Sequence, residues 1–142
     1  MLMYVFSIII IVASNIFYNI CSKSMPEKAN PFSSLFVTYL TGAVITIIAF
    51  KFYKTDKGFF QSFEDLNWTS IVLGFAIVGL EFGYIMAYRA GWNISTGSLV
   101  ANILLALILI PVGILFYKEG FDINKIFGIS LCIIGLIFIN KR

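Results

Sequence analysis

Charged side chains divide this chain into long apolar runs. The runs are residues 1–22, 29–50, 66–88, 90–117 and 126–140. A helix that crosses the hydrocarbon core of a bilayer needs about 20 apolar residues, within a range of roughly 17–25. Four runs reach this length, and the last does so if the helix starts at Asp122 and Lys125 extends its side chain to the interface. Because the runs lack the alternation of barrel strands, we predict about five transmembrane helices.

Aromatic, proline and asparagine residues mark the ends of the predicted helices. Trp68 and Trp92 bracket the third helix, and tryptophan prefers the interface between membrane and water. Pro31 interrupts the chain between the first and second helices, and Asn93 offers a start for the fourth. Pro111 lies inside the fourth predicted helix, where it is either a tolerated kink or a flexible point of a moving helix.

Composition supports a membrane location. Of the 142 residues 60% are hydrophobic and only 12% are charged, whereas about a quarter of a typical soluble domain is charged. A soluble chain of this size could not bury so much apolar surface. We therefore expect an all-α integral membrane protein, a single domain over residues 1–142, in the plasma (inner) membrane of a bacterium. Residues 1–22 lack the basic start of a signal peptide and are too long for its apolar region, so we interpret them as the first helix.

The net charge of +3 is too small to indicate a nucleic-acid partner. Cys21 and Cys132 lie in or beside apolar runs, so we expect two small buried hydrophobic residues rather than a disulfide framework.

The basic residues are divided evenly between the two sides of the predicted membrane protein. One side has Lys51, Lys54, Lys57, Lys118 and Lys125, and the other has Lys23, Lys28, Arg89, Lys141 and Arg142. An excess of lysine and arginine on the cytoplasmic side normally sets orientation, and here the count is five against five. Either a partner or the first helix decides the orientation, or the chain inserts both ways and pairs antiparallel. Two antiparallel copies would form an inverted repeat, the arrangement from which many secondary transporters build a midplane site.

Several kinds of chemistry are excluded. The chain has no histidine, which removes histidine-dependent catalytic triads, histidine metal sites and histidine proton relays. No Gly-rich motif for binding phosphate is present. We therefore expect no enzymatic activity, no cofactor and no metal.

Glu81 is the one charged residue inside the apolar runs. A charged side chain near the middle of a membrane helix costs several kcal/mol unless it is paired, protonated or hydrated, and such residues mark functional sites by default. Glu81 is therefore a candidate for exchanging protons or binding a substrate. The alternative is a protonated carboxyl group that hydrogen-bonds a neighbouring helix.

Polar residues recur at helical spacing around Glu81 and predict a partly hydrated, aromatic-walled pocket. Tyr84 and Tyr88 follow Glu81 at positions i+3 and i+7, on the same helical face. The other candidate substrate- or proton-binding residues are Asn15, Tyr18, Asn19, Ser98 and Asn102. Aromatic rings beside a carboxylate suit a cation. Alternatively, such polar residues simply hold helices together.

Small residues predict close helix contacts. Gly79 and Gly83 flank Glu81 at a four-residue spacing. Gly128 and Gly135 are expected to allow a similar close contact on the fifth helix. Arg89, at the end of the third helix, is expected among the lipid headgroups.

The second half of the chain contains four short motifs, namely STGSLVAN at residues 95–102, LIPVG at 109–113, Lys118-Glu119, and GISLCIIG at 128–135. In order and spacing they resemble the EamA-type repeat of the drug/metabolite transporter superfamily. That repeat ends with a Pro-containing fourth helix, a Gly-Glu or Lys-Glu at its exit, and a fifth helix of the form Gly-x6-Gly. Length, helix number and loop placement agree as well, so the resemblance covers nearly the whole chain. It gives Glu119 the place of the exit glutamate, where a structural role is implied.

The resemblance implies a transporter for a small metabolite, an amino acid-like solute or a cation. Most family members fuse two such repeats, and because five is odd the second is inverted; this chain resembles a single copy and should need a partner. The related small multidrug resistance transporters are antiparallel homodimers with a glutamate in their first helix. Here the first helix has no acid, and Glu81 in the third is the candidate for that role.

We therefore expect a secondary transporter of a small metabolite or organic cation. It would work in the lipid bilayer as an antiparallel homodimer of dual topology, as an antiporter coupled to protons through Glu81. The alternative is a non-autonomous subunit of a heterodimeric transporter or lipid-linked sugar flippase.

Overall fold

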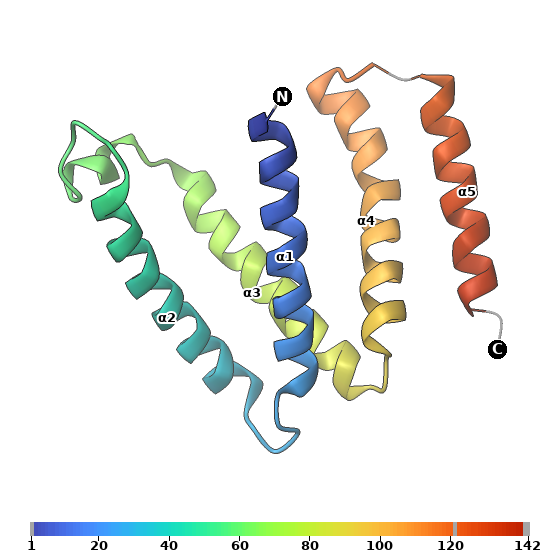
Figure 1. The fold of residues 1–142 in the computed structure, drawn as a ribbon, viewed down its shortest axis with the longest axis horizontal. Coiled ribbons are helices and arrows are strands. Elements are labelled where there is room, and N and C mark those ends of the chain that lie inside the picture. Colours follow the sequence, from blue (N-terminus) through green and yellow to red (C-terminus); the bar gives the residue numbers. More distant parts are fainter. Residues whose placement is uncertain (1, 121, 141–142) are drawn as a thin grey trace. The chain divides into compact units, whose positions relative to one another are not determined.

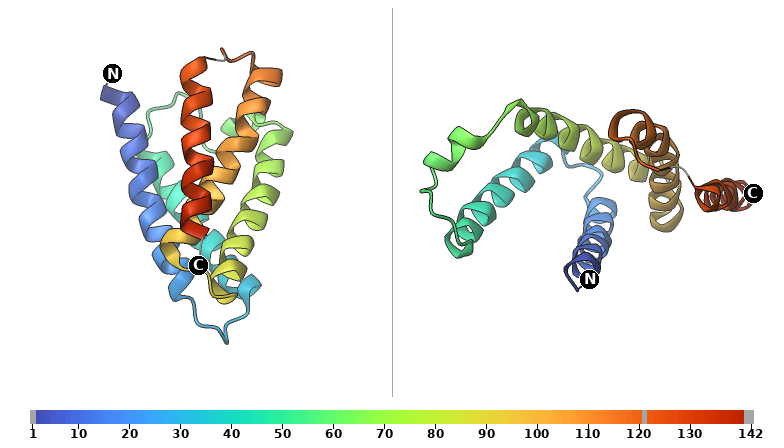
Figure 2. Two further views of the ribbon diagram at one scale, coloured as in Figure 1. Left: turned by 90° about the vertical axis from the view of Figure 1, so that its right-hand side faces the viewer. Right: turned by 90° about the horizontal axis from the view of Figure 1, so that it is seen from above.

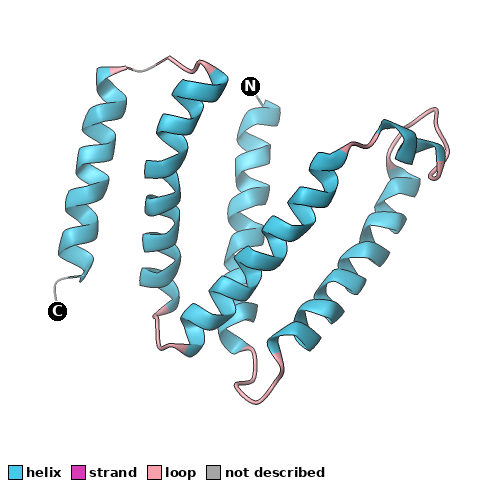
Figure 3. Cartoon of the chain, turned by 180° about the vertical axis from the view of Figure 1, so that it is seen from behind, coloured by secondary structure: helices cyan, strands magenta, loops and turns pink. Residues whose placement is uncertain are grey.

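The structure, a computed structural model, describes residues 2–120 and 122–140. Figure 1 shows five α-helices along the chain, which are α1 (Leu2–Ser24), α2 (Pro31–Phe52), α3 (Trp68–Arg89), α4 (Ile94–Tyr117) and α5 (Ile123–Asn140). A short 3₁₀-helix, η1 (Gln61–Asp65), lies between α2 and α3. Figure 3 shows helices and connecting loops, and no strand occurs in the described residues. The predicted all-α architecture is confirmed.

Four of these helices are long and apolar enough to cross a membrane. They are α1, α2, α3 and α4, each with 22 to 24 residues. The fifth, α5, has 18 residues, and its apolar part covers the shorter stretch Ile126–Ile139. At 1.5 Å per residue, 18 residues extend about 27 Å, close to the thickness of a hydrocarbon core of about 30 Å. The short fifth helix thus agrees with the short fifth run in the sequence, while the predicted start at Met1 lies outside the described residues.

Local capping fixes the helix starts. The Asn30 side chain accepts hydrogen bonds from the backbone N–H groups of Phe32, at 2.9 Å, and Ser33, at 3.4 Å. Pro31 occupies the first helical position, where a backbone N–H has no partner within the helix and is not needed. The Asn67 side chain accepts from the N–H of Thr69 at 2.9 Å and starts α3. Because of these caps, α2 and α3 each begin two residues after the first residue of the corresponding apolar run.

The chain divides into two compact units, Met1–Ala90 and Gly91–Arg142. In the first unit α1 and α2 both pack against α3, and Figure 2 shows these three helices in two further views. Its buried residues are Asn19, Leu35, Ile85 and Tyr88, which lie toward the C-terminal ends of α1 and α3 and the N-terminal end of α2. In the second unit α4 packs against α5, and the two run in opposite directions (Figure 1).

Most large apolar side chains lie on the surface of the chain, as expected where lipid takes the place of water. The exposed set includes most of the isoleucine, leucine, valine and phenylalanine residues of the helices. In water so large an apolar surface would aggregate, whereas hydrocarbon solvates it. Cys21 and Cys132 are free thiols and are exposed, so the prediction that they are buried is wrong.

The predicted glycine contacts are also absent from the described part of the chain. A Cβ atom added at Gly79, Gly83, Gly128 or Gly135 would meet nothing within 4 Å. The close contact lies instead at Gly113 in α4, where an added Cβ would come within 2.9 Å of the Glu119 side chain. A spacing of small residues permits close packing, but it does not supply the neighbour.

Candidate functional site

A buried hydrogen bond joins α1 to α3. The Tyr88 hydroxyl donates to the side-chain oxygen of Asn19, and the Asn19 amide donates at 2.8 Å to the backbone carbonyl of Asn15. Tyr88 is 4% exposed and Asn19 is 6% exposed. Hydrogen bonds between membrane helices contribute roughly 0.6–2 kcal/mol each. The structure therefore brings these two predicted site residues together, but in a contact that holds the helices.

Two basic residues form hydrogen bonds at the adjacent end of the first unit. The Lys23 ammonium donates to the backbone carbonyl of Tyr88 at 3.3 Å and lies 5.6 Å from the centre of the Tyr88 ring. The Arg89 guanidinium donates to the carbonyls of Pro26, at 3.1 Å, and Ala29, at 2.7 Å. Arg89 thus binds the α1–α2 connection, and its expected place among the lipid headgroups stays a prediction. The Pro26 carbonyl also accepts from the Ala29 N–H at 3.0 Å, so Arg89 adds a second donor to Pro26 and a charged donor to the Ala29 carbonyl.

Glu81 lies on α3 where side chains from α1 and α2 approach it. It is half-buried and interacts electrostatically with Tyr18 of α1 and with Tyr39 of α2. No lysine or arginine forms an ion pair with Glu81 in the described residues, where the ion pair observed joins Lys57 to Asp65 in the α2–α3 connection. Three helices therefore surround a carboxyl group without a protein counter-ion.

Aromatic rings complete the surroundings of Glu81. The Tyr18 and Tyr84 rings meet edge to face with their centroids 5.5 Å apart, and the Tyr84 and Tyr88 centroids are 5.9 Å apart. We call Glu81, Tyr18, Tyr39 and Tyr84 the tyrosine–carboxyl cluster. The ring faces of tyrosine carry partial negative charge and attract cations. The cluster thus combines a carboxylate with three phenol rings.

Two hydroxyl groups of the cluster are buried and unsatisfied. The Tyr18 and Tyr39 hydroxyl oxygens have no solvent contact and no hydrogen bond of acceptable geometry within the described chain. An unsatisfied polar group in hydrocarbon costs several kcal/mol, so such groups point to a missing partner. The sequence argument did not select Tyr39 as a site residue. Tyr39 follows Leu35 by four positions and shares its helical face, but the burial of Leu35 is evident only from the structure.

The remaining predicted site residues make local hydrogen bonds. The Asn15 side chain is exposed and donates to the backbone carbonyl of Ile11 at 3.3 Å, within its own helix. In the second unit, the Asn102 amide donates to the backbone carbonyl of Ser98 at 2.8 Å and to its hydroxyl at 3.3 Å. These bonds satisfy polar groups inside one helix and leave the roles of Asn15, Ser98 and Asn102 as a proposal.

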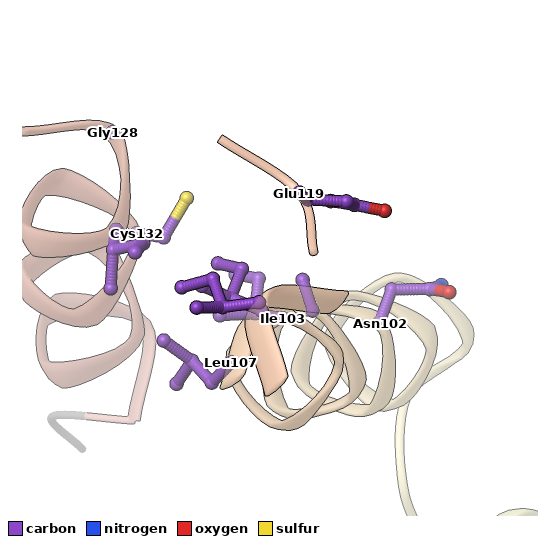
Figure 4. A pocket seen from close by; sticks show the side chains of 10 residues that line it. Asn102, Ile103, Leu107, Glu119, Gly128 and Cys132 are labelled. Atoms are coloured by element: carbon purple, nitrogen blue, oxygen red, sulfur yellow. The ribbon is translucent and has the colours of Figure 1, made fainter. Parts of the chain in front are cut away.

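The second unit has an apolar groove of about 480 Å³ between α4 and α5. Figure 4 shows Ile103 and Leu107 of α4, Cys132 of α5, and Asn102 and Glu119 among its lining residues. Glu119 follows the left-handed residue Lys118, which ends α4, and its N–H donates at 3.1 Å to the carbonyl of Gly113. The Glu119 side chain also packs where Gly113 lacks a Cβ, which supports a structural role at the end of α4.

Apolar helices that span a bilayer, one of them with a carboxyl group inside the span, define a polytopic membrane protein of the kind that moves solutes. A sequence profile of the EamA-like transporter family matches residues 2–141, so the chain belongs to that family. This confirms the resemblance found in the fourth and fifth helices and makes the protein a membrane transporter of the drug/metabolite superfamily rather than an enzyme. No curated protein and no solved structure gives a significant match.

Proposed function

We propose that this chain is a secondary transporter of a small metabolite or organic cation, which exchanges its substrate for protons at Glu81. The observation that carries the proposal is a carboxyl group inside an apolar helix that forms no ion pair with the described residues and lies among tyrosines from three helices. A lone carboxylate in a low-dielectric environment is stabilised by one positive charge, either a proton or a cation. Binding of one excludes the other, and this competition couples the two fluxes.

The proposal includes an antiparallel homodimer in the plasma membrane of a bacterium. Five lysine and arginine residues lie on each side of the predicted membrane protein, so the charge distribution favours neither orientation. A five-helix domain has its ends on opposite sides of the membrane, and a second copy of opposite orientation supplies the inverted repeat on which alternating access is commonly built. Two copies of the tyrosine–carboxyl cluster would then serve one transport pathway.

The test of proton coupling is Glu81→Gln in the full chain reconstituted into proteoliposomes. The neutral side chain keeps the size of glutamate but cannot change charge, so pH-driven substrate exchange should fall at least about a hundredfold, as expected when an essential charge is lost. Glu64→Gln is the matched control, because Glu64 lies in η1 outside the spans and should leave exchange unchanged. Full pH-driven exchange by a folded Glu81→Gln protein would contradict the proposal.

A further inference from the structure

The two unsatisfied hydroxyls of the tyrosine–carboxyl cluster restrict what can bind beside Glu81. The Tyr18 hydroxyl comes from α1 and the Tyr39 hydroxyl from α2, and both interact with the carboxyl group on α3. A phenol oxygen can both donate and accept a hydrogen bond. When Glu81 is ionised the Tyr39 hydroxyl can donate to it, but the lone pairs of Tyr39 then still lack a donor in the described chain. The Tyr18 oxygen lies beside the Ser22 hydroxyl, but makes no hydrogen bond of acceptable geometry to it.

In the part of the chain that the structure describes, Lys23 and Arg89 do not supply that donor. Lys23 lies over the Tyr88 ring and donates to the Tyr88 carbonyl, and Arg89 donates to the carbonyls of the α1–α2 connection. Neither forms an ion pair with Glu81 in the described chain. Lys23 and Arg89 are therefore engaged at the end of the helices, and a proton or a cationic ligand can supply the positive charge at Glu81.

We propose that the tyrosine–carboxyl cluster is a binding site for protonated amines, and that Tyr18 and Tyr39 determine specificity by accepting N–H hydrogen bonds from the ligand. This inference rests on the proposed function and assigns its substrate class. A primary ammonium has three N–H donors, equal in number to one carboxylate oxygen and two phenol oxygens. The Tyr18 and Tyr84 rings, in edge-to-face contact, provide the aromatic surface for the rest of the cation.

The proposal separates two classes of cation that share charge and aromatic attraction. A quaternary ammonium has the charge but no N–H, so it leaves both phenol oxygens unsatisfied. A site that is built to hydrogen-bond a ligand discriminates against an analogue that lacks the donor more strongly than an apolar pocket does. Removal of a phenol oxygen should therefore weaken amine binding selectively.

The test uses benzylammonium and benzyltrimethylammonium as probes, with binding to the full chain in lipid nanodiscs measured by calorimetry. Tyr39→Phe should weaken benzylammonium binding about tenfold and change benzyltrimethylammonium binding by less than about twofold, because only the former loses a charge-assisted hydrogen bond. Tyr18→Phe should shift the ratio in the same direction and serves as an independent variant. Tyr53→Phe is the control, since Tyr53 is exposed at the end of α2 and should leave both affinities unchanged.

The outcomes also separate this inference from the proposed function. If neither tyrosine variant changes the ratio of the two affinities, or if binding of both probes weakens equally, the hydroxyls do not determine which ligand binds and the inference is wrong. Glu81→Gln should abolish binding of both probes. If it does so while the tyrosine variants leave the ratio unchanged, only the amine preference is rejected; if both probes still bind, the role of Glu81 in the proposed function fails as well.

Discussion

The Tyr88 hydroxyl of α3 donates a hydrogen bond to the Asn19 side chain of α1, and both side chains are almost fully buried. This bond lies next to the tyrosine–carboxyl cluster, since Asn19 directly follows Tyr18 on α1 and Tyr88 follows Tyr84 by four positions, about one turn, on α3. It fixes the distance between α1 and α3 at one end of the cluster. The contact therefore supports the site without using its ligand-binding groups.

Tyr88→Phe should lower the free energy of unfolding by about 1–2 kcal/mol, because the side-chain oxygen of Asn19 remains buried without its donor. Unfolding in mixed lipid and detergent micelles measures the change. Tyr117→Phe is the matched control, since Tyr117 is 76% exposed and should have no effect. Equal stability of the Tyr88→Phe protein and the wild type would show that the bond adds nothing to the packing of α1 on α3.

Arg89→Ala should loosen the α1–α2 connection, because the Pro26 and Ala29 carbonyls both lose a charged donor, and Pro26 keeps only its bond from the Ala29 N–H. Amide hydrogen exchange over residues 25–30 should become at least about tenfold faster, as expected from the loss of a charge-assisted hydrogen bond. The α2–α3 connection, residues 53–67, is the internal control and should keep its exchange rate. Unchanged exchange over residues 25–30 would contradict this role of Arg89.

Gly91→Ala should destabilise the protein by about 1–2 kcal/mol, because Gly91 has a φ of 98°, where a Cβ is strained. Gly74→Ala, within α3, should instead raise the free energy of unfolding. A Cβ at Gly74 meets no atom within 4 Å, and alanine favours helix over glycine by up to about 1 kcal/mol. Measured free energies of unfolding should therefore change in opposite directions, and a loss at Gly74 would reveal a contact that a single chain does not show.

The sequence predicted the helices well because their limits depend on local chemistry. Charged residues, Pro31 and the capping residues Asn30 and Asn67 act within a few positions of the helix ends that they set. The approach of Tyr39 to Glu81 depends instead on how α2 packs against α3. The periodicity of one helix contains no information about that rotation, which explains why Tyr39 was missed.

The same reasoning explains the glycine and arginine predictions. The spacing of Gly79 and Gly83 indicates a face on which another helix could approach closely, but no atom of the described chain fills it. The position of Arg89 at a helix end did not predict its hydrogen-bond partners, which belong to a connection about 60 residues earlier in the chain. Long-range partners of this kind follow from tertiary packing alone.

The central claim, a self-sufficient antiparallel transporter, is tested most directly by the orientation of the chain in intact cells. A single cysteine added after Arg142, in a background without Cys21 and Cys132, is exposed to a thiol reagent that does not cross the membrane. Labelling of about half of the molecules is the predicted result, because five basic residues on each side leave both orientations equally favoured. Labelling of all molecules, or of none, would mean one fixed orientation and would contradict the antiparallel homodimer.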